Sequence, residues 1–209
     1  MFDSPSQPVS YVRDLLDGFG PPWFLCGGWA ADSWLGRQSR DHADVDIGVF
    51  HDDQKAIFEH FEGWALIAHD PNVPDDTKEP WNGRRLDPPA HIHVTTRTSN
   101  LSTLPDATHS AYEFEFLLAE GSGDWILRQT PYLAVPRDRA IRPSPWGLPT
   151  ATPPVILYFK AVSDDPIRRQ DEQDFHTLLP ILDQEERDWL RESLATAHPH
   201  HPWLRHLPT

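Results

Sequence analysis

The stretches Cys26-Gly27-Gly28-Trp29 and Asp44-Val45-Asp46-Ile47-Gly48-Val49 decide how this chain is interpreted. The two glycines predict a turn that enters a helix, where backbone N–H groups can approach an anion. The second stretch alternates as a strand, so Asp44 and Asp46 project from the same face. Two adjacent carboxylates repel each other unless a cation lies between them. A phosphate-binding turn beside a divalent-cation site is typical of enzymes that catalyse phosphoryl or nucleotidyl transfer.

The chain resembles the polymerase-β-like nucleotidyltransferase superfamily, and in finer detail its aminoglycoside 2''-adenylyltransferase-like branch. Seven segments carry the resemblance: Gly27-Gly28-Trp29-Ala30, Trp34-Leu35-Gly36-Arg37, Arg40-Asp41-His42, Asp44-Val45-Asp46-Ile47, Leu157-Tyr158-Phe159-Lys160-Ala161, Asp171-Glu172-Gln173-Asp174-Phe175 and His201-Pro202-Trp203-Leu204. The similarity runs from about Trp23 to the C-terminus, in an order that chance rarely supplies.

The resemblance implies a magnesium site and in-line nucleotidyl transfer. Asp44 and Asp46 would hold Mg²⁺, a hard cation that prefers carboxylate and phosphate oxygens. Glu115 is the expected third carboxylate, with Glu113 on the same strand face as the fallback. A substrate hydroxyl would attack the α-phosphorus of a nucleoside triphosphate, pyrophosphate would leave, and Glu115 could take the hydroxyl proton.

The nucleotide is expected to contact a second set of residues, some of which also have structural interpretations. Arg40 and His42 could instead form a loop-stabilising pair, and Lys160 could be a snorkelling surface lysine. Two departures from the family pattern bear on this set: Trp29 stands where the superfamily often has Ser, and Gln170 where the branch has Lys. The full expected set is Gly27, Gly28, Arg40, His42 and Lys160.

Four further residues have two interpretations each. Asp171 and Asp174 could orient a cationic substrate or could favour a helix start. His91 and His93 share a strand face, as zinc ligands can, but the sequence indicates no third soft ligand beside them. We therefore expect these histidines to be packing residues or residues at the rim of the site.

Composition bounds the class of protein. With 209 residues and 38% hydrophobic content, the chain can bury one substantial core. A single cysteine rules out an internal disulfide, and there is no signal-peptide pattern or membrane-length apolar run, so we expect a cytoplasmic protein. The formal net charge of -14 disfavours nucleic-acid binding. This acidity could attract a cationic substrate, although on charge alone a role in solubility is the favoured explanation.

The pattern of elements predicts an α+β fold. We expect a nucleotidyltransferase-type mixed sheet flanked by helices over residues 1–148 and a C-terminal helical domain over 149–209. Helices are predicted from Thr152-Pro153 onward, over 171–179 and over 184–197. Residues 112–118 alternate as a strand, whose expected antiparallel partner is 125–128.

The sequence therefore predicts Mg²⁺-dependent transfer of AMP or another NMP from ATP or another nucleoside triphosphate. The expected acceptor is a hydroxyl of a small, cationic molecule such as an aminoglycoside. Two alternatives stay open: an antitoxin-like nucleotidyltransferase that modifies a partner protein, and a non-catalytic nucleotide-binding protein on the same scaffold. The loops expected to contact the acceptor are residues 70–90 and 98–110, and their sequences do not indicate which acceptor binds. Both a monomer and a homodimer are compatible with the sequence.

Overall fold

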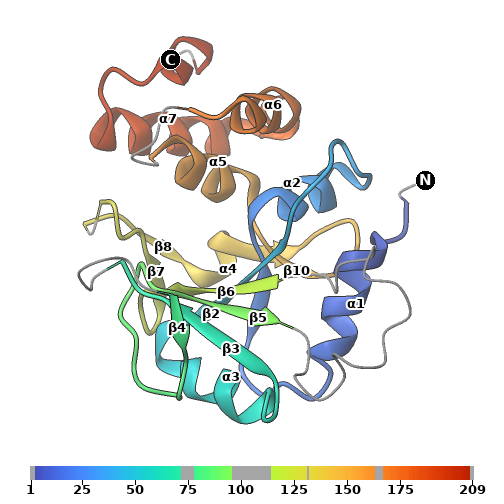
Figure 1. Ribbon diagram of the computed structural model, residues 1–209. Coiled ribbons are helices and arrows are strands. Elements are labelled where there is room, and N and C mark those ends of the chain that lie inside the picture. The colour runs from blue at the N-terminus through green and yellow to red at the C-terminus, as the bar shows by residue number, and fades with distance from the viewer. Residues whose placement is uncertain (1–2, 72–77, 96–113, 131, 163–166, 208–209) are drawn as a thin grey trace.

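A mixed β-sheet forms the centre of the molecule (Figure 1). The computed structural model describes residues 3–71, 78–95, 114–130, 132–162 and 167–207. Within these ranges eight strands form one sheet in the order β4-β3-β5-β6-β2-β1-β10-β9. Helices lie against both faces, which confirms the predicted α+β class. The strands are β1 (Trp23–Leu25), β2 (Val45–Phe50), β3 (Ala65–His69), β4 (Lys78–Pro80), β5 (His91–Thr95), β6 (Phe114–Ala119), β9 (Ile141–Pro143) and β10 (Pro149–Ala151).

Strand pairing brings polar residues of three neighbouring strands onto one face of this sheet. β2 and β6 are parallel, with Asp46 opposite Glu115, and β5 is antiparallel to β6, with His93 opposite Glu115. Because successive side chains point to opposite faces, Ile47 and Phe116 point the other way, and both are buried. One face of the sheet is thus polar and the other belongs to the hydrophobic core.

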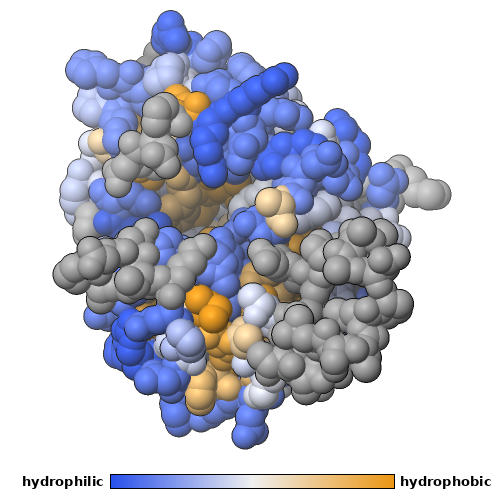
Figure 2. Space-filling model, viewed as in Figure 1, coloured by the Kyte–Doolittle hydropathy of each residue, from blue (hydrophilic) through white to orange (hydrophobic). Residues whose placement is uncertain are grey.

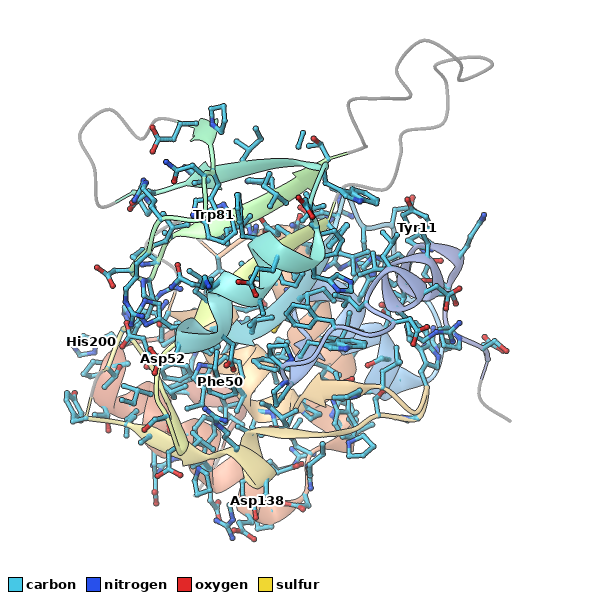
Figure 3. All side chains as sticks on the ribbon, turned by 90° about the horizontal axis from the view of Figure 1, so that it is seen from below. Tyr11, Phe50, Asp52, Trp81, Asp138 and His200 are labelled. Atoms are coloured by element: carbon cyan, nitrogen blue, oxygen red, sulfur yellow. The ribbon has the colours of Figure 1, made fainter. Side chains whose placement is uncertain are left out.

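The apolar face is covered by α1 (Gln7–Leu15) and α3 (Gln54–His60), which is preceded by the 3-10 turn η1 (His51–Asp53). In Figure 1 α3 lies below the sheet and α1 lies at its right-hand side, and in the view from below in Figure 3 α3 lies in front of the sheet. Phe61, at the end of α3, packs against Phe116 with ring centroids 5.8 Å apart. Burying a side chain of this kind contributes about 1.5–3 kcal/mol, so this layer holds β2 and β6 in register from beneath.

The C-terminal part of the described chain is helical, as predicted, and lies over the polar face of the sheet (Figure 1). Its first helix begins at Pro153, since proline suits the first helical position. Asp183 and Glu186 form a reciprocal capping box at the start of the longest helix. The elements are α5 (Pro153–Ala161), α6 (Arg169–Leu178), η3 (Leu179–Ile181), α7 (Gln184–Ala197) and η4 (Pro202–His206). The division at residue 148 stays a prediction; β10, directly after it, pairs with β1 in the sheet.

The predicted antiparallel partner of β6 is wrong. β2 and β5 occupy both edges of β6 over Phe114–Leu117, so residues 125–128 have no edge on which to pair along that part of the strand. Instead β7 (Asp124–Ile126) pairs with β8 (Ala134–Pro136) in a separate two-stranded sheet that leads into α4 (Arg137–Ala140). An isolated bridge joins Glu120 to Ile126. Among the described helices, none combines the length and apolarity that a membrane crossing requires.

Candidate active site

A cavity of about 1080 Å³ lies between the polar face of the sheet and the C-terminal helices. Figure 2 shows the hollow below those helices, with pale orange apolar surface inside it and blue hydrophilic surface around it. This volume is slightly above the roughly 300–1,000 Å³ that is typical of pockets for one small molecule. All the residues that the sequence predicts for the site line it: Gly27, Gly28, Arg40, His42, Asp44, Asp46, Glu115 and Lys160. Glu113, the fallback carboxylate, lies outside the described residues.

Three carboxylates meet on the sheet side of the cavity. One oxygen each from Asp44, Asp46 and Glu115 lies within 4.8 Å of the others. Burial raises the pKa of Asp46 well above its ordinary value, and a hydrogen bond with Glu115 and the charges of Glu115 and Asp44 raise it further. Mutual repulsion among carboxylates that lie this close together is relieved by a proton or by a cation. This donor set is all oxygen, with Asp46 on β2, Glu115 on β6 and Asp44 directly before β2, and it fits a hard divalent ion such as Mg²⁺.

The glycine turn lies directly against this cluster. Gly27 has φ +61°, and a Cβ added there would lie 1.6 Å from Oδ2 of Asp46. The Cys26 N–H donates to the backbone carbonyl of Asp46 at 2.8 Å, which ties the turn to β2. Only glycine therefore allows α2 (Gly27–Leu35) to begin so close to the carboxylates.

Arg40 and His42 lie on the other side of the same turn. A Cβ added to Gly28 would lie 2.3 Å from Nδ1 of His42 and 2.5 Å from Nη2 of Arg40. The His42 ring packs on Trp29, with centroids 4.2 Å apart, and its Nε2 is 2.5 Å from Oδ2 of Asp32. Asp32 is fully buried and fixes the orientation of the His42 ring. The sequence prediction missed Asp32, although a carboxylate inside the apolar helix 27–35 was a readable signal.

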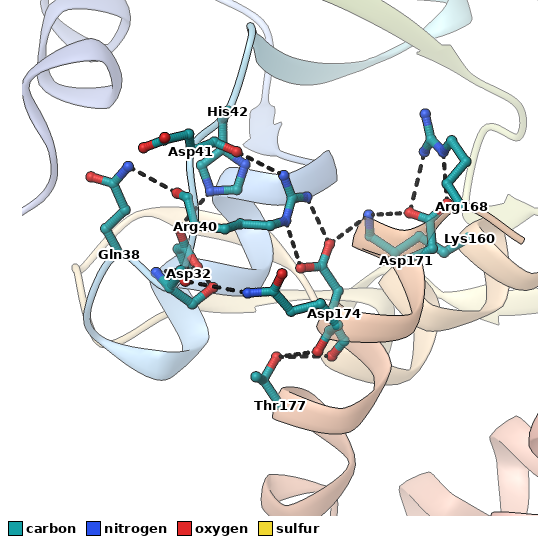
Figure 4. Close-up of polar contacts among 12 residues, drawn as sticks. Asp32, Gln38, Arg40, Asp41, His42, Lys160, Arg168, Asp171, Asp174 and Thr177 are labelled. Atoms are coloured by element: carbon teal, nitrogen blue, oxygen red, sulfur yellow. Dashed lines mark hydrogen bonds and ion pairs between the residues drawn. The ribbon is translucent and has the colours of Figure 1, made fainter.

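An ion-pair group links the Arg40 loop to α5 and α6 (Figure 4). Arg40 donates to both oxygens of Asp174, at 2.9 and 2.8 Å. Nζ of Lys160 lies 2.9 Å from Asp171 and 2.8 Å from Asp174, and Arg168 donates to Asp171 at 2.7 Å. Three cations and two carboxylates leave this group with one net positive charge.

These contacts bear on the interpretations that the sequence left open. Burial by itself would raise the pKa values of Asp171 and Asp174, but pairing with the neighbouring cations outweighs it and holds both below their ordinary value. The chain's own cations thus occupy these carboxylates, which disfavours the idea that they orient a cationic substrate. The side chain of Lys160 is 8% exposed, so the snorkelling interpretation is wrong. Arg40 stabilises its loop and also lines the cavity.

Sequence reasoning also missed a third histidine on the polar face. His69 on β3 is the strand partner of His91 on β5, so His69, His91 and His93 lie together. The expectation that no third soft ligand accompanies His91 and His93 is therefore wrong. The pairing of β3 with β5 is a long-range contact, and no local pattern in the sequence indicates its register.

Comparison with known proteins agrees with this architecture. The family model for aminoglycoside-2''-adenylyltransferases matches residues 9–71, which include the glycine turn and both Asp44 and Asp46. Over those residues the chain is similar to aminoglycoside-2''-adenylyltransferases, the branch of the nucleotidyltransferase superfamily that its sequence motifs resemble. A lincosamide resistance protein of Staphylococcus haemolyticus is 28% identical to this chain over 65 residues. That match spans 30% of the chain and 40% of the relative, less than half the length of either.

Solved structures of nucleotidyltransferases share the fold over nearly their whole length. The lincosamide antibiotic adenylyltransferase LnuA, solved with lincomycin bound, has a TM-score of 0.55 at 15% identity, covering 86% of this chain and 99% of LnuA. The solution structure of the antibiotic-resistance factor ANT(2'')-Ia has a TM-score of 0.55 at 13% identity and covers 91% of each chain. ANT(2'')-Ia in complex with adenylyl-2''-tobramycin has a TM-score of 0.53 at 12% identity, covering 90% of this chain and 95% of that one. At these identities the likeness concerns the fold alone.

Proposed function

We propose that the protein is a Mg²⁺-dependent nucleotidyltransferase that transfers AMP, or another NMP, from a nucleoside triphosphate to a hydroxyl of a small antibiotic-like acceptor. The observation that carries the proposal is the meeting, in one cavity, of three carboxylates, a glycine turn and a cationic group from separate parts of the chain. The family match and the antibiotic substrates in the names of the similar proteins support it. A cationic acceptor such as an aminoglycoside fits the net charge of -14.

The nucleotide's phosphates would lie between the two walls of the cavity. Asp44, Asp46 and Glu115 would hold Mg²⁺, which supplies charge neutralisation for the phosphate oxygens when it is bound. The backbone N–H groups at the start of α2 point an uncompensated positive dipole toward the same space. Arg40 and His42, which contact Gly28 from the other side, add positive charge or hydrogen-bond donors beside those N–H groups.

The chemical step needs a proton acceptor and an aligned acceptor hydroxyl. In the proposed step a new bond forms between the hydroxyl oxygen and the α-phosphorus, and the bond from that phosphorus to pyrophosphate breaks. Glu115 would take the hydroxyl proton, because it lies beside Asp46 at the carboxylate cluster and faces the cavity. No covalent enzyme intermediate is required, so positioning and charge stabilisation supply the acceleration.

Pyrophosphate release tests the proposal. ATP, GTP, CTP and UTP are each offered with Mg²⁺, with and without a panel of aminoglycosides and lincosamides. The Asp46→Asn variant should abolish release, whereas the matched control Asp138→Asn should retain it, since Asp138 is exposed on α4 at the far edge of the molecule (Figure 3). Release that needs one acceptor and depends on Asp46 supports transfer to a small molecule.

Other results would favour the alternatives. Mg²⁺-dependent nucleotide binding without release to any small molecule would direct the search to a protein acceptor. Nucleotide binding that is the same in Asp46→Asn would favour a non-catalytic binding protein. The exposed large hydrophobic side chains among the described residues, Phe58, Tyr132 and Ile181, come from three separate segments and give the protein-acceptor alternative no added support.

A further inference from the structure

A cluster of three imidazoles lies beside the carboxylate site on the polar face of the sheet. His69 and His91 are directly opposite each other on the antiparallel strands β3 and β5. His93 is two residues along β5 from His91 and therefore points to the same face. His93 is also the strand partner of Glu115 on β6. Three adjacent strands thus present three histidines and one glutamate to a common point.

The ligand-type atoms of this cluster are already close together. Nδ1 of His69 lies 2.8 Å from Nε2 of His91. Oε2 of Glu115 lies 3.4 Å from Nε2 of His91 and 3.6 Å from Nε2 of His93. One nitrogen from each histidine lies within 4.8 Å of the other two. Ligands of a tetrahedral zinc ion, with Zn–N bonds of about 2.0–2.1 Å, are separated by roughly 3.3 Å, so small side-chain rotations would complete such a geometry.

We propose that His69, His91 and His93 bind a divalent transition-metal ion of the Zn²⁺ class, with Glu115 as the fourth ligand. Imidazole nitrogens select such ions, whereas Mg²⁺ prefers oxygen. Three histidines hold Zn²⁺ in one class of zinc site, and Asp and Glu oxygens also bind this ion. The side chains of His91, His93 and Glu115 are 15–27% exposed, so an ion can enter while the strands hold the ligands rigidly.

Glu115 connects this site with the carboxylate cluster. It is hydrogen-bonded to Asp46 and is close to both Nε2 atoms. A metal ion at the histidines would hold Glu115 in place from the side opposite to Asp46. The histidine site itself does not depend on the proposed transfer reaction, so each can fail without the other.

Cobalt titration tests the proposal, because tetrahedral Co²⁺ absorbs strongly in the visible range and Mg²⁺ does not. The full chain is freed of metals with EDTA, transferred to excess Mg²⁺, and titrated with Co²⁺. We expect one equivalent of Co²⁺ to produce the absorption and Zn²⁺ to displace it. His69→Gln, His91→Gln and His93→Gln should each weaken Co²⁺ binding by more than the roughly 10–100-fold that loss of an outer-shell partner costs.

Two control variants separate this site from others. His200→Gln, in the exposed histidine-containing segment before η4, should leave the Co²⁺ absorption unchanged. Asp46→Asn should retain it too, since Asp46 is not a ligand of the histidine site. No absorption in the wild type, or an absorption that survives all three histidine variants, would overturn the proposal.

A wild-type measurement covers the case in which a variant does not fold. Zn²⁺ should shift the NMR signals of three histidine rings, those of His69, His91 and His93. Shifts confined to His198, His200 and His201 would show that the ion binds the C-terminal histidines instead, and would overturn the proposal equally.

Discussion

Replacing Gly27 by alanine separates backbone strain from contact with the carboxylate site. The left-handed backbone costs a non-glycine residue about 1–2 kcal/mol, and Gly27 has φ +61°. The added Cβ would also lie 1.6 Å from Oδ2 of Asp46, so that side chain must move. Overpacking of this kind costs a further 1–3 kcal/mol or so. We expect Gly27→Ala to lose about 2–5 kcal/mol of the free energy of unfolding, the sum of both effects.

Gly63 supplies the matched control. It has φ +80°, and a Cβ added there has no other atom within 4 Å. Gly63→Ala should therefore lose only the backbone cost of about 1–2 kcal/mol. Urea unfolding followed by circular dichroism measures both variants, in EDTA and in Mg²⁺. Gly27→Ala should also lose any stabilisation by Mg²⁺, whereas Gly63→Ala should keep it.

A double variant shows whether Asp46 is the cause. In Gly27→Ala/Asp46→Ala the nearest remaining atom of residue 46 would be its Cβ, at 3.1 Å, a contact that a small shift relieves. Measured against Asp46→Ala alone, Gly27→Ala should then cost no more than Gly63→Ala costs the wild type. Equal losses for Gly27→Ala and Gly63→Ala, or an excess that persists without the Asp46 carboxylate, would refute the reasoning.

Three further predictions concern the polar groups around the cavity. Asp174→Asn removes the shared partner of Arg40 and Lys160 and should lose about 3–5 kcal/mol at pH 7. Pairing lowers the pKa of Asp174, so the extra unfolding free energy of the wild type over Asp174→Asn should be fully present above the ordinary aspartate pKa. It should decrease as the pH falls through the pKa that Asp174 has in the folded protein. If urea unfolding gives the same difference in unfolding free energy between wild type and variant at pH 7 and pH 3, this prediction is wrong. Asp32→Asn weakens the contact that orients the His42 ring and should raise the KM for nucleotide more than it lowers kcat. An unchanged KM in steady-state kinetics would argue against a role of His42 in nucleotide binding. Asp46→Asn removes a carboxylate that its neighbours repel and should raise the Tm of the metal-free protein, by about 2–4 °C for each kcal/mol of unfolding free energy gained. It should also abolish any rise in Tm on adding Mg²⁺. A Tm in EDTA below that of the wild type would contradict the idea that the carboxylates repel each other.

The site residues that sequence reasoning found are those with strong local signals. The pair Gly27-Gly28 predicts a tight turn, because glycine adopts backbone conformations that other residues rarely do. The i, i+2 spacing of Asp44 and Asp46 predicts that both side chains project from the same face of a strand. Glu115 needed the family resemblance, because its nearness to Asp46 arises only when the parallel pairing of β2 with β6 forms. The assignment of Asp44, Asp46 and Glu115 as metal ligands remains a prediction.

What the sequence could not indicate depends on pairing between distant segments. His69 joins His91 through the register of β3 and β5, and the hairpin expected after β6 does not form because β2 and β5 occupy both edges of β6 over Phe114–Leu117. Likewise, Asp174 binds Arg40 across 134 positions of sequence. Such contacts are set by tertiary packing, which local periodicity does not encode.

The ion-pair group around Asp174 has a consequence for how proteins of this kind diverge. Arg40 comes from the loop before β2, Lys160 from α5 and Asp174 from α6, so one carboxylate serves cations on two other segments. A change at any one of these positions leaves a buried charge without its partner unless another position changes as well. We therefore expect Arg40, Lys160 and Asp174 to vary together among related sequences. A transplant of the C-terminal helices between relatives should succeed only when the loop that carries Arg40 is transferred with them.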